Sequence, residues 1–90
     1  MVEVTERAKE RLLDMKRSAN IGEPDVGLRL EPAATGEWRL VPDRASEGDQ
    51  VVEHNGSKVL LIGPDASEVL GDRQVDCHET TPGETHLVLT

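Results

Sequence analysis

Cysteine and aromatic residues are almost absent from this chain of 90 residues. It contains one cysteine, Cys77, and one tryptophan, Trp38, with neither phenylalanine nor tyrosine. A single cysteine cannot form an intramolecular disulfide, so the fold does not depend on an oxidising compartment. The core must be aliphatic, with Trp38 either part of it or an exposed contact, and no row of aromatic rings is available to stack on bases.

Basic residues are outnumbered by acidic ones, and long apolar runs are absent. Ten lysines and arginines stand against 18 aspartates and glutamates, and the formal net charge of −8 disfavours nucleic acid as a partner. No apolar run approaches the roughly 18 residues needed to span a bilayer. Residues 1–6 have neither the basic start nor the apolar stretch of a secretion signal. We therefore expect a cytoplasmic protein that binds neither nucleic acid nor membranes.

The charge is unevenly distributed along the chain. Residues 1–20 hold five bases and four acids, which leaves five bases and 14 acids, a net charge of −9, for residues 21–90. This pattern is typical of an acidic, β-rich body with a nearly neutral helix on it, and it also suits an acidic face that docks a basic partner. A chain this short has one core, so residues 1–90 are predicted to form a single domain.

The N-terminal segment has the apolar period of a surface helix. Its apolar residues recur three or four positions apart, at Val4, Ala8, Leu12, Met15 and Ala19. One buried stripe among charged positions predicts a helix from about Thr5 to Ser18. Thr5 is a suitable N-cap, and Lys16 and Arg17 lie in the last turn, where positive charge is favourable.

The rest of the chain alternates between strand and turn signals. Strands are expected at residues 26–31, 37–42, 73–79 and 85–90, with a hairpin about Asn55-Gly56 between them. A short helix is predicted to start at Gly63-Pro64 and to end at Gly71. Residues 81–84 suit a type II turn. The elements predict an α+β fold of small mixed β-sheets packed with one amphipathic N-terminal helix and one short helix.

The hairpin is the best specified of these elements, because Asn-Gly supplies the two positive φ angles of a type I′ turn. The predicted cross-strand pairs are His54–Ser57, Glu53–Lys58, Val52–Val59 and Val51–Leu60. Residues 59–62 are apolar at every position, which predicts a central strand covered on both faces, one of them by the first helix.

The order of the elements and several fragments resemble the HesB/IscA-like family, the A-type carriers of iron–sulfur cluster assembly. The fragments follow the family's order over nearly the whole chain. They are Thr5–Ala8, similar to the family's T-x-x-A helix start; Gly27–Leu30, its G-L-R-L strand; Asp49–Glu53, its D-x-V-x-E strand; Lys58–Ile62, the strand after it; Val69–Gly71, the end of the short helix; and Val75-Asp76, a hydrophobic-Asp pair. The resemblance implies a HesB-like fold.

The cluster ligands of that family have no counterparts among these 90 residues. Family carriers use one cysteine in a Gly-Cys-x-Gly loop after the G-L-R-L strand and two in a Cys-Gly-Cys tail. The corresponding loop here is Ala34–Trp38, with Glu37 near the cysteine position, and the sequence reaches Thr90 without such a tail. Cys77 lies where the family usually has an apolar or aromatic side chain. The resemblance therefore implies a cysteine-deficient member.

Cys77, His78 and His86 are the residues that could bind a metal. An iron–sulfur cluster takes about four thiolate or histidine ligands, so a symmetric dimer would have to share Cys77 and His78. Neighbouring residues of a strand point to opposite faces, which hinders such a site. Pairing of His78 with His86 would place both near Asp76, as a zinc or iron site requires. In the simpler interpretation Cys77 is a small buried side chain beside Val75.

No catalytic motif accompanies these residues. Glycine-serine elbows, phosphate-binding glycine loops and dinucleotide fingerprints are missing, and strand geometry separates Cys77 from His78. We expect a protein that is not an enzyme, holds no cofactor and acts as a protein-binding or accessory module, as a monomer or homodimer. The alternatives are a carrier of iron or an iron–sulfur cluster that uses Cys77, His78 or His86 across a dimer, and a purely structural domain.

Overall fold

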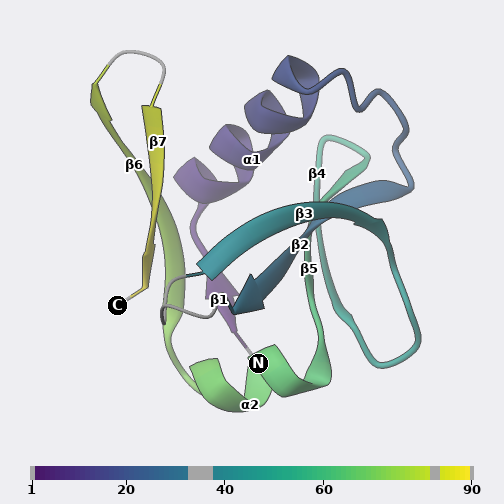
Figure 1. Ribbon diagram of the computed structural model, residues 1–90, viewed down its shortest axis with the longest axis vertical. Coiled ribbons are helices and arrows are strands. Elements are labelled where there is room, and N and C mark those ends of the chain that lie inside the picture. Colours follow the sequence, from purple (N-terminus) through teal and green to yellow (C-terminus); the bar gives the residue numbers. More distant parts are fainter. Residues whose placement is uncertain (1, 33–37, 82–83, 90) are drawn as a thin grey trace.

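The part of the chain that the structure describes forms two helices and two β-sheets (Figure 1). This computed structural model describes residues 2–32, 38–81 and 84–89, and their side chains except at 78–81 and 84–87. The elements are β1 (Glu3–Val4), α1 (Glu6–Ser18), β2 (Val26–Pro32), β3 (Trp38–Arg44), β4 (Gln50–His54), β5 (Ser57–Ile62), α2 (Pro64–Leu70), β6 (Gln74–Thr81) and β7 (Glu84–Leu89). The predicted α+β class is confirmed, and β1 is a strand that the sequence pattern did not indicate.

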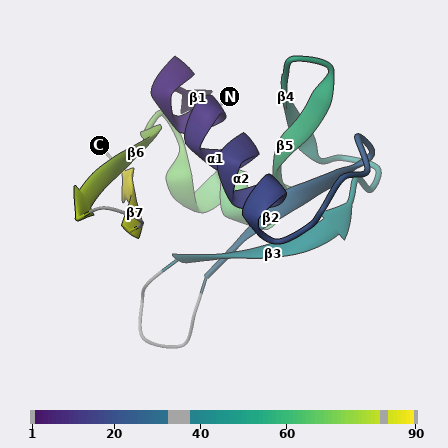
Figure 2. The ribbon, with the colours of Figure 1, turned by 90° about the horizontal axis from the view of Figure 1, so that it is seen from above.

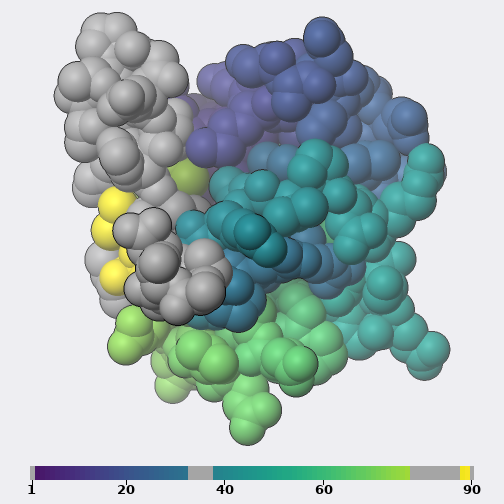
Figure 3. Space-filling model, in the orientation of Figure 1, coloured from purple at the N-terminus to yellow at the C-terminus, as the bar shows by residue number. Residues whose placement is uncertain are grey.

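Both sheets are mixed. The first has the order β1-β6-β7, with β1 parallel and β7 antiparallel to β6. The second has the order β3-β2-β5-β4, with a parallel β2/β5 pair at its centre and an antiparallel pair on either side. α1 lies between the two sheets and packs on β4, β5 and β6 (Figure 2). α2, green in Figure 3, lies against β2 and connects the second sheet to the first. Neither helix in the described residues is long and apolar enough to cross a membrane.

α1 begins and ends where the sequence predicts. Thr5 is its N-cap, and the Thr5 Oγ1 accepts a hydrogen bond of 3.0 Å from the backbone N–H of Ala8. The predicted interior stripe is right from Val4 to Met15, since half-buried Met15 packs against the core, and wrong at Ala19, which is exposed. The buried residues of the helix are Ala8, Leu12, Leu13 and Lys16. Burial thus follows the four-residue spacing from Ala8 through Leu12 to Lys16.

Lys16 is an interior residue, although its position near the helix end predicted only a favourable charge. It is 2% exposed. Its Nζ donates hydrogen bonds of 2.7 Å to the backbone carbonyl of Lys58 and 3.3 Å to that of Glu23. A lysine can take this position because its four-carbon stem is apolar while its ammonium group still finds acceptors.

The β4–β5 hairpin turns at Asn55-Gly56, with φ angles of 52° and 80°, as predicted. The predicted pairs His54–Ser57 and Glu53–Lys58 are confirmed. The pairs predicted beyond them are wrong, because a β-bulge at Val52/Glu53 shifts the register and gives Val52–Leu60 and Val51–Leu61. A bulge adds one residue to one strand, and here it accompanies four consecutive residues, 59–62, that are each 0% exposed.

The remaining local signals are also borne out where the structure describes them. Pro64 occupies the first turn of α2 after the N-cap Gly63, and Gly71 ends the helix with a φ of 56°. β6 and β7 bring His78 opposite His86 in the register, as predicted. The predicted turn at 81–84 and the loop at 33–37 include residues outside the described part of the chain.

The core is aliphatic, as the composition requires. Its fully enclosed side chains include Leu12, Leu30, Leu60, Ile62, Val75 and Cys77. Trp38 is half-buried at the start of β3, where it and Leu40 pack against the core cluster. Trp38 therefore contributes to the core from its edge.

Candidate functional site

Two of the fragments that carry the family resemblance meet at the start of α1. The Thr5 hydroxyl, which caps α1, also donates a hydrogen bond of 2.7 Å to Asp76 Oδ1 on β6. Arg7 donates from Nε to Oδ1 at 3.2 Å and from Nη2 to Oδ2 at 2.7 Å. The backbone N–H of Cys77 also donates to Asp76 Oδ1, at 2.8 Å. Asp76 thus connects the first helix to β6.

A second pair of fragments meets at Arg29 and Asp49. The two Nη atoms of Arg29 donate to the two carboxylate oxygens of Asp49 at 3.0 Å and 2.7 Å, and Nε donates to Asp43 Oδ2 at 2.7 Å. The side chains of Arg29 and Asp49 are 15% and 2% exposed. Arg29 also donates to the backbone carbonyl of Arg44 at 3.2 Å. It therefore holds the β3–β4 loop against β2.

Gly27, at the start of the G-L-R-L fragment, has a packing role beside this ion pair. A Cβ atom at this position would lie 3.1 Å from Leu61 Cγ, which is tighter than an ordinary contact. Leu61 is 0% exposed although it lies outside the main core cluster. The fragment therefore supplies a close approach and an ion pair, both of them structural.

The ion pair changes the acidity of its carboxylates. Direct hydrogen bonds from Arg29 lower the pKa of Asp49 and that of Asp43 below the ordinary value of 3.8. A lowered carboxyl pKa means that the folded protein binds the proton less tightly than the unfolded chain. The stabilisation is therefore complete above the unfolded pKa and is lost as the pH falls through the lower, folded pKa.

We expect Asp49→Asn to remove part of the acid sensitivity of folding, because asparagine does not titrate. The free energy of unfolding, measured by denaturant titration between about pH 5 and pH 2, should fall less steeply for the variant than for the parent. Glu31→Gln is the matched control, since Glu31 forms an exposed pair with Arg39 at 3.5 Å. An equal slope for the Asp49 variant and the parent would contradict the assignment.

Cys77 is enclosed in the core, on the same face of β6 as Val75. Both side chains are 0% exposed. Burial raises the pKa of the Cys77 thiol to about 11, and the neighbouring Asp76 carboxylate acts in the same direction. Metals bind the thiolate, which needs an accessible and electropositive position. In this conformation Cys77 has the properties of a small core side chain.

The predicted metal ligands are only partly brought together. His78 and His86 face each other in the β6/β7 register, but their side chains lie outside the described part of the structure. Asp76, the carboxylate predicted to complete a zinc or iron site, is held by Thr5 and Arg7. Among the described residues no group of three histidine, cysteine, aspartate or glutamate side chains is arranged to hold a metal. A site at Cys77, His78 and His86 stays a prediction.

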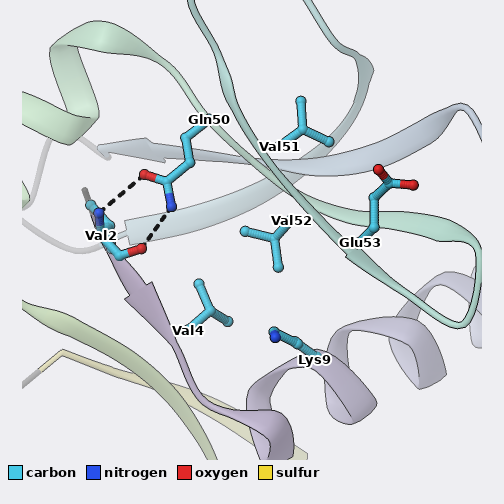
Figure 4. A pocket seen from close by; sticks show the side chains of 7 residues that line it. All are labelled: Val2, Val4, Lys9, Gln50, Val51, Val52 and Glu53. Carbon is cyan, nitrogen blue, oxygen red and sulfur yellow. Dashed lines mark hydrogen bonds between the residues drawn. The ribbon is translucent and has the colours of Figure 1, made fainter.

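A surface groove between β1 and β4 is a feature that sequence reasoning missed (Figure 4). Its volume is about 250 Å³, and it is lined by Val2, Val4, Lys9, Gln50, Val51, Val52 and Glu53. The Gln50 side chain closes one end, because Oε1 accepts from the Val2 N–H at 3.1 Å and Nε2 donates to the Val2 carbonyl at 2.6 Å. These two residues are 48 positions apart, and β1 is only two residues long, so no local pattern indicates the groove.

The chain matches no family model and no curated protein. Its fold is nevertheless shared with solved structures. Escherichia coli SufA, which is involved in the biosynthesis of iron–sulfur clusters, matches it with a TM-score of 0.65 and 18% identity, over 99% of this chain and 83% of SufA. IscA, solved with a [2Fe-2S] cluster, matches with a TM-score of 0.61 and 21% identity, over 100% of this chain and 84% of IscA. The chain therefore has the α+β fold of these two proteins.

Proposed function

We propose that this protein is a HesB/IscA-like relative of the iron–sulfur carriers that serves cluster assembly as a non-catalytic, protein-binding or accessory module. The observation that carries the proposal is the position of Cys77. It is the single cysteine of these 90 residues, and its side chain is 0% exposed. We place the protein in the cytoplasm as a monomer or homodimer that holds no cofactor and binds neither nucleic acid nor membranes.

The roles of the family-like fragments support this proposal. Thr5 and Asp76 join α1 to β6, and Arg29 and Asp49 join β2 to the β3–β4 loop. Gly27 gives Leu61 the space to pack. None of these contacts depends on a cluster, so a chain can keep the scaffold of SufA and IscA without holding one.

One observation favours the alternative of a metal carrier. His78 and His86 are paired in the register of β6 and β7, and histidine is a common ligand of zinc and iron. A symmetric dimer would double the number of such ligands, with Cys77, His78 and His86 from each chain. Cys77 would have to leave the core for this purpose.

Anaerobic reconstitution with ferrous iron and sulfide tests the proposal. We expect the desalted protein to be colourless, without charge-transfer absorption in the visible range and with far less than stoichiometric iron, because the enclosed thiol presents no thiolate to the cluster. The thiol should react with an aromatic disulfide reagent only after denaturation. A stable brown protein with stoichiometric iron would contradict the proposal.

Two variants identify the ligands in that event. Cys77→Ser would abolish the absorption if Cys77 binds the cluster, whereas the double substitution of His78 and His86 by alanine would abolish iron or zinc binding that depends on the histidine pair. Calorimetry of iron and zinc binding to the parent protein, without sulfide, distinguishes a simple metal site from a cluster site. Absence of binding in all these measurements is the result that the accessory role predicts.

A further inference from the structure

The edges of the two sheets face each other across the groove. β4 is an edge strand of the second sheet, and β1 is an edge strand of the first. Within the described residues, the two hydrogen bonds between Gln50 and Val2 join these edges. Toward Glu53, the outer edge of β4 has no main-chain partner in the part of the chain that the structure describes. Such an edge readily pairs with an added strand.

The groove suits a peptide main chain. The Gln50 carboxamide both donates to and accepts from the backbone of Val2, as two paired peptide groups do in a sheet. Four of its seven lining residues are valines, Val2, Val4, Val51 and Val52, and the other three, Lys9, Gln50 and Glu53, have polar side chains. A ligand of this groove must therefore supply hydrogen bonds together with small apolar side chains.

The charges around the groove favour a basic ligand. Lys9 is paired with Glu6 at 3.2 Å, and Glu6 also lies 4.0 Å from Nδ1 of His54. Glu53 is exposed, and among the described residues it has no ion-pair partner, although Lys58 is opposite it in the register. Glu53 is therefore the uncompensated charge of the groove. It belongs to the acidic segment 21–90, whose net charge is −9 from 14 acids and five bases.

We propose that the outer edge of β4 binds an extended segment of a partner protein as an added strand, with a lysine or arginine of that segment facing Glu53. Main-chain hydrogen bonds to β4 would supply the affinity, and small side chains would fit over Val4 and Val52, which close the floor of the groove (Figure 4). This inference rests on the proposed protein-binding function and specifies its surface and the chemistry of the partner.

Amide NMR titration of the labelled, metal-free protein tests the inference with two blocked peptides. The first is Ser-Val-Lys-Val-Lys-Ser, and the second has glutamate in place of both lysines. We expect the lysine peptide to shift the amides of residues 50–54 and 2–4. The glutamate peptide should bind about fivefold more weakly, because one exposed ion pair contributes on the order of that factor.

Charge reversal provides the specific variant. Glu53→Lys should weaken the lysine peptide about fivefold and strengthen the glutamate peptide, and Glu53→Gln should reduce the difference between them. Both substitutions are at an exposed position and should leave the fold intact, although Glu53→Lys, which places a second lysine opposite Lys58, should lower the melting temperature slightly. Glu68→Lys, at an exposed and equally unpaired position of α2 among the described residues, should leave both affinities unchanged.

Several results would overturn the inference. They are the absence of shifts at β4 with either peptide, shifts centred on α2 or another surface, and a peptide preference that Glu53→Lys does not alter. Shifts at β4 that appear with rising protein concentration alone would assign the edge to a second copy of the chain instead. The titration uses no iron or sulfide, so its failure leaves the reconstitution result untouched, and a reconstituted cluster would leave the mapped surface untouched.

Discussion

Asp49→Ala should lower the free energy of unfolding by about 2 kcal/mol, because it removes two charge-assisted hydrogen bonds from a half-buried arginine. The Arg29 guanidinium, with a side chain 15% exposed, would lose its two hydrogen bonds to Asp49 and keep only those to Asp43 and to the carbonyl of Arg44. A domain of this size has a total stability on the order of 5–10 kcal/mol, so the variant should be markedly less stable. Denaturant titration monitored by circular dichroism measures the loss.

The second sheet contains a matched control for this prediction. Arg39 and Glu31 form a pair at 3.5 Å whose side chains are 65% and 37% exposed, and Glu31→Ala should cost less than about 1 kcal/mol. The double variant Asp49→Ala with Arg29→Met should lose less stability than the sum of the two single losses, because either single substitution already removes the hydrogen bonds between Arg29 and Asp49. Equal small losses at Asp49 and Glu31 would show that the pair of Arg29 and Asp49 does not hold the loop.

Lys16→Ala should destabilise the protein by about 2–3 kcal/mol, since it removes buried methylene groups and two hydrogen bonds from a charged donor. The cost of burying the ammonium group offsets part of this loss. That cost also explains why burial lowers the pKa of Lys16 below the ordinary 10.5. The carbonyls of Lys58 and Glu23 would lose the group that joins the start of β5 to the loop after α1. Thermal and denaturant unfolding both report this change.

Two neighbouring substitutions separate packing from charge. Lys16→Met preserves most of the buried stem and removes the buried charge, so its cost should be less than half that of Lys16→Ala. Arg17→Ala, next in sequence but with a side chain 71% exposed, should change stability by less than about 0.5 kcal/mol. A similar effect at Lys16 and Arg17 would contradict the interior position of Lys16.

Sequence reasoning succeeded where one short segment carries the physical cause. The positive φ angles of Asn55-Gly56, the Thr5 cap and the helix end at Gly71 depend on a few neighbouring residues, and all three appear as predicted. The same holds for the burial of Cys77 on the face of β6 that Val75 also occupies, because alternation along one strand determines which side chains share a face. The register of β4 and β5 was right only next to the turn, because the β-bulge at Val52/Glu53 shifts the pairing beyond it and no signal in the turn indicates a bulge.

By itself the sequence determined the α+β class, the positions of most helices and strands, and the interior place of the single cysteine. Tertiary structure alone decided the contacts that define the candidate surfaces. Each of these hydrogen bonds joins residues far apart in the sequence: Arg29 and Asp49 are 20 positions apart, Lys16 and Lys58 are 42 apart, and Val2 and Gln50 are 48 apart. Propensity and periodicity act over a few residues, whereas these contacts exist only once helix and sheets have packed together and brought distant segments within hydrogen-bond distance.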